Sequence, residues 1–261
     1  MAFDGITVSC LRKELSDKLI GGRIAKIVQP EADELLLTIK NNANQYRLLL
    51  SASASLPLVY LTDKNKPAPM TAPGFCMLLR KHLGGGRIVD VSQPSLERIL
   101  HFHIEHLDEM GDLCRKNLIV ELMGKHSNLI FCDENGMIID SIKRVSAQTS
   151  SVREVLPGRP YFIAQTQEKL DPLTTTEEAF CQSVFSKPMK LAKAIYSSYT
   201  GISPIIAEEL CHRASLESDQ SANTIPEMAR LHLWHLFDLM MEDVRQHRYT
   251  PLIVSDSHGD P

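Results

Sequence analysis

The chain has 261 residues with 28 basic and 32 acidic side chains, a formal net charge of −4, and 43% hydrophobic residues. This balance is typical of a globular chain with one large domain or two ordinary ones, and it excludes a protein that binds polyanions through bulk charge. No apolar run reaches the roughly 18 residues that a membrane span requires, and residues 1–5 lack the layout of a signal peptide. We therefore expect a cytoplasmic protein with no membrane partner.

Leucines at every fourth position predict the first helix. Leu11, Leu15 and Leu19 recur on one face of residues 6–20, and two glycines follow. Short segments rich in apolar and β-branched residues then predict four strands, at residues 23–29, 34–39, 45–50 and 58–62. The proline-rich residues 64–74 indicate a linker.

The next part of the chain repeats the first at a constant distance of 64 residues. Residues 85–94 match residues 21–30 without a gap, and residues 75–83 again predict a helix. We interpret this as an internal duplication, with halves at about 5–63 and 74–145, although chance similarity is the alternative. Two helix-plus-antiparallel-strand halves that each bury one sheet face predict an α+β sandwich or flattened barrel with a helix beside each sheet.

Residues 128–143 predict a hairpin around Asp133-Glu-Asn-Gly136, and helical character begins near residue 174. Further helices are predicted at residues 190–199, 203–213 and 226–246. We therefore expect one domain over residues 1–170 and an all-helical domain over residues 171–248. Residues 249–261 look like the start of a further part of the protein.

The turn between the helices predicted at residues 190–199 and 203–213 contains Thr200, Gly201, Ile202 and Ser203. Helix, glycine turn, helix is the layout of a helix-hairpin-helix, whose turn amides can face a phosphate. An ordinary helical hairpin is the alternative.

Charged residues accompany two segments that otherwise predict strands. Glu97 and Arg98 open one segment, and Glu121 lies inside the other, just before a polar turn. Charges beside apolar strands need partners or a ligand. One alternative is that Arg98 and Glu121 form a buried ion pair across the strands.

Neither a metal site nor a catalytic site is predicted. His101, His103 and His106 lie close enough in sequence for a metal site, but no supporting cysteine pair accompanies them, so we expect solvated strand histidines. The six scattered cysteines are interpreted as buried thiols in a reducing compartment. The chain has no phosphate loop, Ser-His-Asp arrangement or nucleotide fingerprint, so we expect no cofactor and no enzyme.

Six motifs in chain order resemble the N-terminal half of the NFACT family. They are Phe3-Asp-Gly5, Phe75-Cys-Met-Leu-Leu-Arg-Lys-His82, Glu97-Arg98, Glu121-Leu-Met-Gly-Lys-His-Ser-Asn-Leu-Ile130, Val155-Leu-Pro-Gly158 and Gly201-Ile-Ser-Pro204. The resemblance implies an N-terminal domain similar to the formamidopyrimidine-DNA glycosylase fold, then a helix-hairpin-helix domain. A coiled coil and a basic RNA-binding domain would follow.

The resemblance also implies a function and a set of contact residues. Family members bind the large ribosomal subunit with stalled peptidyl-tRNA and recruit alanyl-tRNA, so that an untemplated alanine tail extends the nascent chain. The family's tRNA-binding motifs match Glu97, Arg98, Glu121, Leu122 and Met123. Glu97 replaces the commoner aspartate, and Leu122 replaces a β-branched residue.

Two neighbours of these motifs could add phosphate contacts. Lys125 and His126 lie in the turn that follows the second strand segment. Arg98 itself can pair with a phosphate or stack on an unpaired base, and Glu97 or Glu121 can accept hydrogen bonds from a base edge.

Two other functions remain open. Many bacterial family members are labelled fibronectin-binding protein A, so a surface adhesin that binds fibronectin is one alternative. The other is a DNA glycosylase-like protein, but such enzymes attack with an N-terminal proline amine, whereas this chain begins Met1-Ala2.

Overall fold

The computed structural model describes residues 3–108, 110–150, 152–164, 168–252 and 255. The first half begins with helix α1 (Gly5–Leu19), which Asp4 caps by accepting a hydrogen bond of 2.8 Å from the Thr7 amide. Four antiparallel strands follow: β1 (Arg23–Glu31), β2 (Glu34–Asn41), β3 (Asn44–Ser51) and β4 (Leu58–Leu61). These elements confirm the sequence prediction, with bounds that differ by one or two residues.

The second half also begins with a helix followed by antiparallel strands, but it has a 3-10 turn and one more strand. Helix α2 (Gly74–Leu83) is followed by β5 (Arg87–Ser92), β6 (Ile99–Leu107), β7 (Leu113–Glu121), the 3-10 turn η1 (Gly124–His126), β8 (Asn128–Asp133) and β9 (Ile138–Ser141). One bound is corrected: β6 starts at Ile99, so Glu97 and Arg98 precede it. The reason is a turn, in which the Glu97 amide donates to the Pro94 carbonyl at 2.9 Å.

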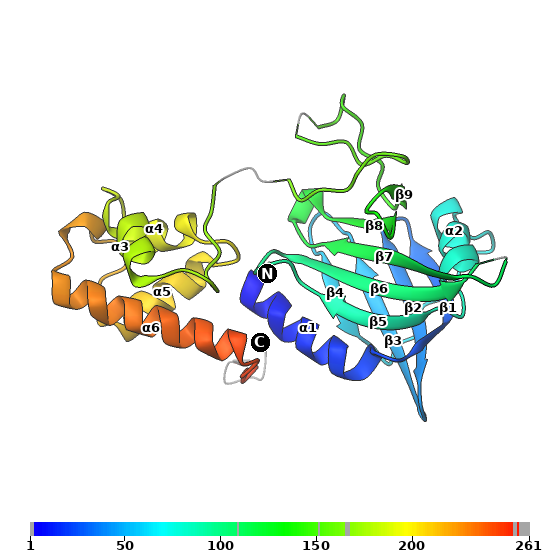
Figure 1. Cartoon of the computed structure of the whole chain (residues 1–261), viewed down its shortest axis with the longest axis horizontal. Helices are drawn as coiled ribbons and strands as arrows, with labels where there is room; N and C mark the ends of the chain where they lie inside the picture. The colour runs from blue at the N-terminus through cyan, green and yellow to red at the C-terminus, as the bar shows by residue number, and fades with distance from the viewer. Residues whose placement is uncertain (1–2, 109, 151, 165–167, 253–254, 256–261) are drawn as a thin grey trace.

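All nine strands form one antiparallel sheet in the order β4-β3-β2-β1-β5-β6-β7-β8-β9. Strands β1 and β5 pair at one position, where Arg23 lies opposite Arg87. Strands β2–β4 lie behind β5–β9 in Figure 1. Buried side chains from both halves, such as Leu37 and Phe102, share one core. The expected α+β class is therefore confirmed, whereas the expected pair of sheets is one sheet folded on itself.

The junction of the halves is built from reciprocal backbone hydrogen bonds. The Gly21 amide donates to the Ile88 carbonyl, and the Gly85 amide donates to the Ile24 carbonyl, both at 2.8 Å. The same 64-residue offset relates these two bonds. Each helix packs on the strands of the other half: α1 packs mainly on β5, and α2 packs mainly on β1.

The helical lobe (residues 168–249) contains α3 (Glu177–Phe185), α4 (Leu191–Ser198), α5 (Pro204–Arg213) and α6 (Glu227–Arg245). Its core centres on Phe180, whose ring lies 4.8 Å from that of Phe237 and 5.8 Å from that of Tyr199. The limits of the two expected domains stay a prediction. In the described part of the chain no helix is long and apolar enough to cross a membrane.

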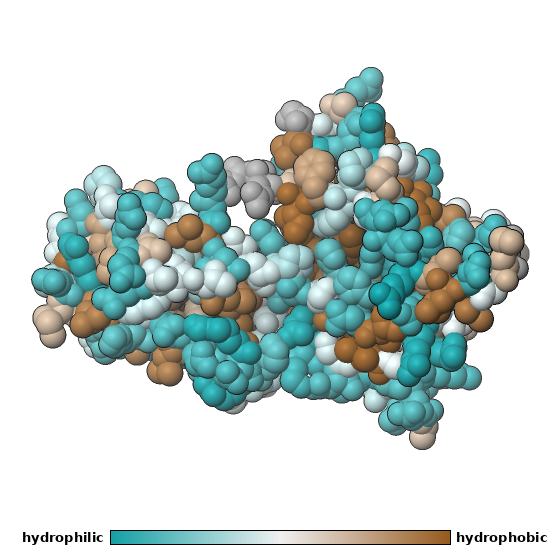
Figure 2. Space-filling model, viewed as in Figure 1, coloured by the Kyte–Doolittle hydropathy of each residue, from teal (hydrophilic) through white to brown (hydrophobic). Residues whose placement is uncertain are grey.

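A segment that we call the strap (residues 152–164) crosses the outer face of the sheet lobe (residues 3–164). Val155 of the strap packs with Ile119 and Ile130 of β7 and β8. Figure 2 shows hydrophobic residues on the side of the sheet lobe that faces the helical lobe. Of residues 249–261, the expected start of a further part, 253–254 and 256–261 lie outside the described residues.

Candidate functional site

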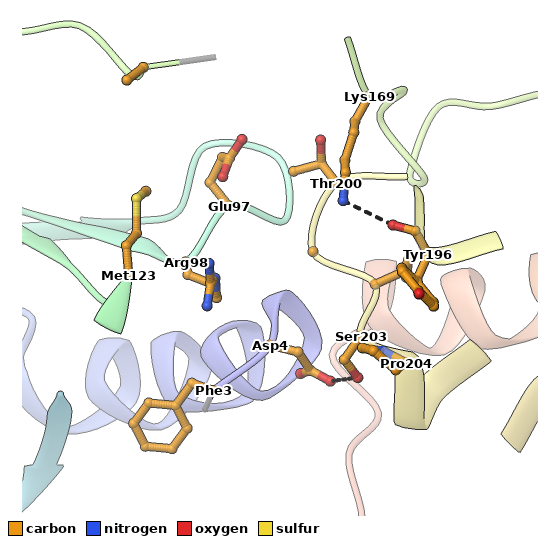
Figure 3. A pocket seen from close by; sticks show the side chains of 13 residues that line it. Phe3, Asp4, Glu97, Arg98, Met123, Lys169, Tyr196, Thr200, Ser203 and Pro204 are labelled. Atoms are coloured by element: carbon orange, nitrogen blue, oxygen red, sulfur yellow. Dashed lines mark hydrogen bonds between the residues drawn. The ribbon is translucent and has the colours of Figure 1, made fainter. Parts of the chain in front are cut away.

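A pocket of about 510 Å³ opens where the sheet lobe meets the helical lobe. Figure 3 shows Glu97, Arg98 and Met123 on one side of the pocket and Thr200 and Ser203 on the other. Gly201 and Ile202 complete the turn on the second side. Two groups of predicted site residues that lie far apart in the chain therefore line one cavity.

The two walls meet through backbone atoms of three residues. The Gly5 amide donates to the Gly201 carbonyl at 2.9 Å. A Cβ atom on Gly201 would lie 2.2 Å from the Leu96 carbonyl oxygen, and one on Gly5 would lie 2.1 Å from it. Gly201 also has φ +74°, which favours glycine. Only glycine fits at both positions, which accounts for a glycine in each of the two motifs.

Two helix N-termini are tied together at the pocket. The Ser203 hydroxyl donates to Asp4 at 2.8 Å, and it also accepts a hydrogen bond of 3.3 Å from the Ile206 amide at the start of α5. Asp4 itself caps α1. Both helices therefore begin at the cavity, where the positive ends of their dipoles favour an anionic ligand.

Charged side chains of both signs face the cavity. The Arg98 side chain has no hydrogen bond or ion pair with another described residue, although the Arg98 carbonyl accepts from the Leu122 amide at 2.9 Å. The Lys169 ammonium donates to the Tyr196 carbonyl at 2.9 Å. Burial raises the pKa of Glu97, against the charges of Arg98 and Lys169. Burial likewise lowers the pKa of Lys169, against the charge of Glu97. The guanidinium of Arg98 is thus left available for a ligand.

Glu121 and Leu122 do not line the pocket. Glu121 is 0% exposed and accepts hydrogen bonds from the Arg153 guanidinium and, at 3.0 Å, from the Tyr161 hydroxyl. Leu122 is 1% exposed and belongs to the core of the sheet lobe. The alternative of an Arg98 to Glu121 ion pair is wrong, because the strap supplies the cation. The pairing of Glu121 with Arg153 could not be predicted from the sequence, since Arg153 lies in an irregular segment.

Lys125 and His126 are exposed on η1 and also lie outside the pocket lining. Their predicted phosphate contacts would have to be made on the neighbouring surface. Among the lining residues, sequence reasoning missed Asp4 and Lys169 as members of the site. Asp4 belongs to a quoted motif, but nothing in the sequence marks Lys169, because only the tertiary fold brings it to the cavity.

The strand histidines differ from the expectation of solvated side chains. The ring of His101 packs edge-on against Tyr161, with centroids 5.8 Å apart, and burial lowers its pKa to about 4. His103 instead shares a hydrogen bond of 2.9 Å with Ser92. Within the described ranges, no group of three or more His, Cys, Asp or Glu residues could hold a metal ion.

The fold and the pocket together give a two-lobed protein whose cavity is lined by a guanidinium, a carboxylate and two helix N-termini. Phe3 and Met123 add apolar surface beside these polar groups. This combination suits a ligand with both an anionic group and a flat ring.

The chain belongs to the NFACT N-terminal family. The family model "NFACT N-terminal and middle domains" matches residues 4–260, which confirms the resemblance of the motifs. The chain is 38% identical over 256 residues to the Rqc2 homolog RqcH of Bacillus subtilis, covering 98% of this chain and 43% of that protein. It is 24% identical over 208 residues to the human ribosome quality control complex subunit NEMF, covering 79% of this chain and 18% of that protein. The chain thus spans less than half the length of these curated relatives.

A solved relative has the same fold. The N-terminal part of the fibronectin/fibrinogen-binding protein of Streptococcus suis superposes with a TM-score of 0.76 at 34% identity, covering 91% of this chain and 85% of that one. MutM, solved in complex with DNA that contains carbocyclic 8-oxo-G, superposes with a TM-score of 0.46 at 14% identity, and no argument is based on it. The expected likeness to the formamidopyrimidine-DNA glycosylase fold stays a prediction.

Proposed function

We propose that this chain is the tRNA-binding part of a ribosome quality-control factor. The factor would bind the large ribosomal subunit with stalled peptidyl-tRNA and recruit alanyl-tRNA for untemplated alanine tailing of the nascent chain. Family membership and the name of the relative NEMF support the quality-control role. Peptide transfer would belong to the ribosome, so the protein acts as an elongation factor in the cytoplasm rather than as an enzyme.

One observation carries the tRNA part of the proposal. The Arg98 guanidinium, which makes no hydrogen bond or ion pair with another described residue, lines the same cavity as the Thr200–Ser203 turn. In this proposal Arg98 pairs with a phosphate or stacks on an unpaired base, and Glu97 accepts hydrogen bonds from a base edge. The α4–α5 pair acts as a helix-hairpin-helix whose turn faces the phosphate backbone of the tRNA, with the Thr200 amide already donating to the Leu170 carbonyl at 3.0 Å.

The test is to recover the full-length protein from its own cells and sequence the bound RNA, with Arg98→Ala alongside. We expect wild type to enrich alanine tRNA and large-subunit RNA, and Arg98→Ala to lose the tRNA while keeping the subunit RNA. The matched control is Arg115→Ala, because Arg115 is an exposed arginine of β7 that pairs with Glu105 of β6, outside the pocket. Absence of both RNAs from the wild type would refute the proposed function.

A second candidate is supported by the solved relative from Streptococcus suis, which is described as fibronectin/fibrinogen-binding. An adhesin must reach the cell surface, whereas a ribosome factor works inside the cell. Labelling of intact cells with a membrane-impermeant reagent separates the two. A labelled fraction that also binds immobilised fibronectin would favour the adhesin.

A further inference from the structure

A buried charge network fastens the strap to β7. Its centre is the carboxylate of Glu121, which receives the Arg153 guanidinium on one oxygen and the Tyr161 hydroxyl on the other. The Arg153 guanidinium carbon also lies 5.6 Å from the centre of the Tyr161 ring, and the Arg153 side chain is only 12% exposed. The Glu121 carboxylate is thus withdrawn from a ligand, whereas Arg153 and Tyr161 are half-buried.

The network leads to the pocket by two routes. On the sheet side, Met123 follows Glu121 by two residues and lines the cavity. On the strap side, Arg153 donates to the Phe162 carbonyl at 2.7 Å, two residues before Ala164, which also lines the cavity. Met123 and the strap further pack in one hydrophobic cluster. A shift of the strap along β7 would therefore displace both pocket residues.

We propose that Arg153 and Tyr161 are positioning residues of the pocket, which act through Glu121 to hold the last residues of the strap (residues 161–164) against β7 and so set the places of Met123 and Ala164. This rests on the proposed function, in which the pocket holds tRNA. Glu121 then supports tRNA binding without touching tRNA.

A charge network at this place favours a single position of the strap on β7. Backbone hydrogen bonds, such as those that Val155 exchanges with Val145, hold the middle of the strap beside residues 136–145. They do not tie the strap to β7, and the apolar contacts there tolerate sliding because hydrophobic attraction has no direction. A buried ion pair contributes little net stability after desolvation, but its hydrogen bonds are satisfied in one register only. Burial and the neighbouring charge of Glu121 both raise the pKa of Tyr161, so its hydroxyl remains a donor.

The experiment compares Arg153→Gln, Glu121→Gln and the double variant in the full-length protein. Two quantities are measured: the tRNA recovered per large subunit, and hydrogen exchange of residues 152–164 in the purified proteins. Arg159→Gln is the matched control, because the exposed Arg159 lies in the same strap but pairs with Glu154 of the strap instead of β7. Tyr161→Phe is a milder variant that keeps the ring and the charge pair.

We expect Arg153→Gln to lower tRNA recovery about tenfold, because Met123 and Ala164 would shift from their places in the pocket. Large-subunit recovery should be unchanged. Strap exchange should rise in the same variant, the double variant should be no worse than either single variant, and Arg159→Gln should match wild type. Arg153→Lys, which restores an ammonium beside Glu121, should recover part of the tRNA. Loss of subunit binding as well would indicate general damage and contradict a positioning role.

Two results would overturn the inference while leaving the proposed function intact. One is loss of tRNA in Glu121→Gln but not in Arg153→Gln, which would make Glu121 a direct contact. The other is unchanged strap exchange in Arg153→Gln. If wild type recovers no tRNA, the proposed function and the pocket role fall together, and the exchange data alone then report whether Arg153 holds the strap.

Discussion

Arg98 and Glu121 carry opposite charges close to one another in the fold, yet burial separates their roles. Arg98 precedes β6 and borders the cavity, whereas Glu121 is 0% exposed and bound by the strap. A free guanidinium can meet a phosphate, but a buried carboxylate with two donors cannot meet a base edge without losing them. Residue type therefore marked both positions in the sequence, and burial limits what each side chain can contact.

The buried imidazole of His101 should make stability depend on pH. Burial, and next the charge of His103, lower its pKa to about 4 from the ordinary 6.5. Unfolded chains therefore take up a proton below about pH 6.5, whereas folded chains do so only near pH 4, so stability falls as the pH drops through this window. We expect His101→Phe to remove about 2 kcal/mol of the loss between pH 7 and pH 5.

Urea unfolding of wild type and His101→Phe at both pH values measures this difference. His126→Phe is the control, because His126 is exposed on η1 and should leave the loss unchanged. Equal losses in wild type and His101→Phe would show that another group causes the acid sensitivity.

At the scale of elements, the first turns of α1 and α5 are stabilised by one shared hydrogen bond. Ser203 both caps α5 and donates to Asp4, which caps α1. Thr176 offers a comparison, because it caps α3 by accepting from the Ala179 amide at 3.3 Å. A cap that joins two helices should contribute more to the free energy of unfolding than a cap of a single helix.

We expect Ser203→Ala to cost about 2 kcal/mol of unfolding free energy and Thr176→Ala about 1 kcal/mol. Combining Ser203→Ala with Asp4→Ala should show a coupling of about 1 kcal/mol in a double-mutant cycle, since both changes remove the same bond. Chemical denaturation of the wild type, the three single variants and the double variant measures these free energies. Strict additivity of the two changes would mean that the bond does not join the helices in solution.

At the scale of the whole molecule, the lobes meet where Gly5, Leu96 and Gly201 are in backbone contact. Leu96 belongs in sequence to the sheet lobe but is buried in the core of the helical lobe. The arrangement in Figure 1 places the start of α1 beside the helical lobe, so the pocket depends on this junction.

A methyl group at Gly201 should therefore disturb both stability and the pocket. We expect Gly201→Ala to cost about 3 kcal/mol or more, because backbone strain adds to the 2.2 Å approach to Leu96. Gly136→Ala is the control: Gly136 has φ +77° but nothing within 4 Å of its Cβ position, so it should cost about 1 kcal/mol. Denaturation midpoints compare the two. Equal costs would mean that the lobes separate easily enough to relieve the contact.

Local patterns predicted much of the secondary structure. Leucine spacing, paired glycines and alternating apolar residues place α1, α2 and β1–β4 within two residues of their observed bounds. The site was predictable only in part: the charges of Glu97 and Arg98 and the glycine turn were visible as anomalies in their segments. Lys169 and Arg153 were not, because they lie outside regular elements and gain their roles from distant neighbours.

By itself the sequence determined the elements, the repeat of 64 residues and the family, because side-chain periodicity and motif order are local properties of the chain. Only the tertiary structure decided that the strands form one folded sheet, that Glu97 and Arg98 share a cavity with the α4–α5 turn, and that Glu121 binds Arg153. These facts depend on contacts between distant segments and on burial, and neither is a property of a residue and its near neighbours in the chain.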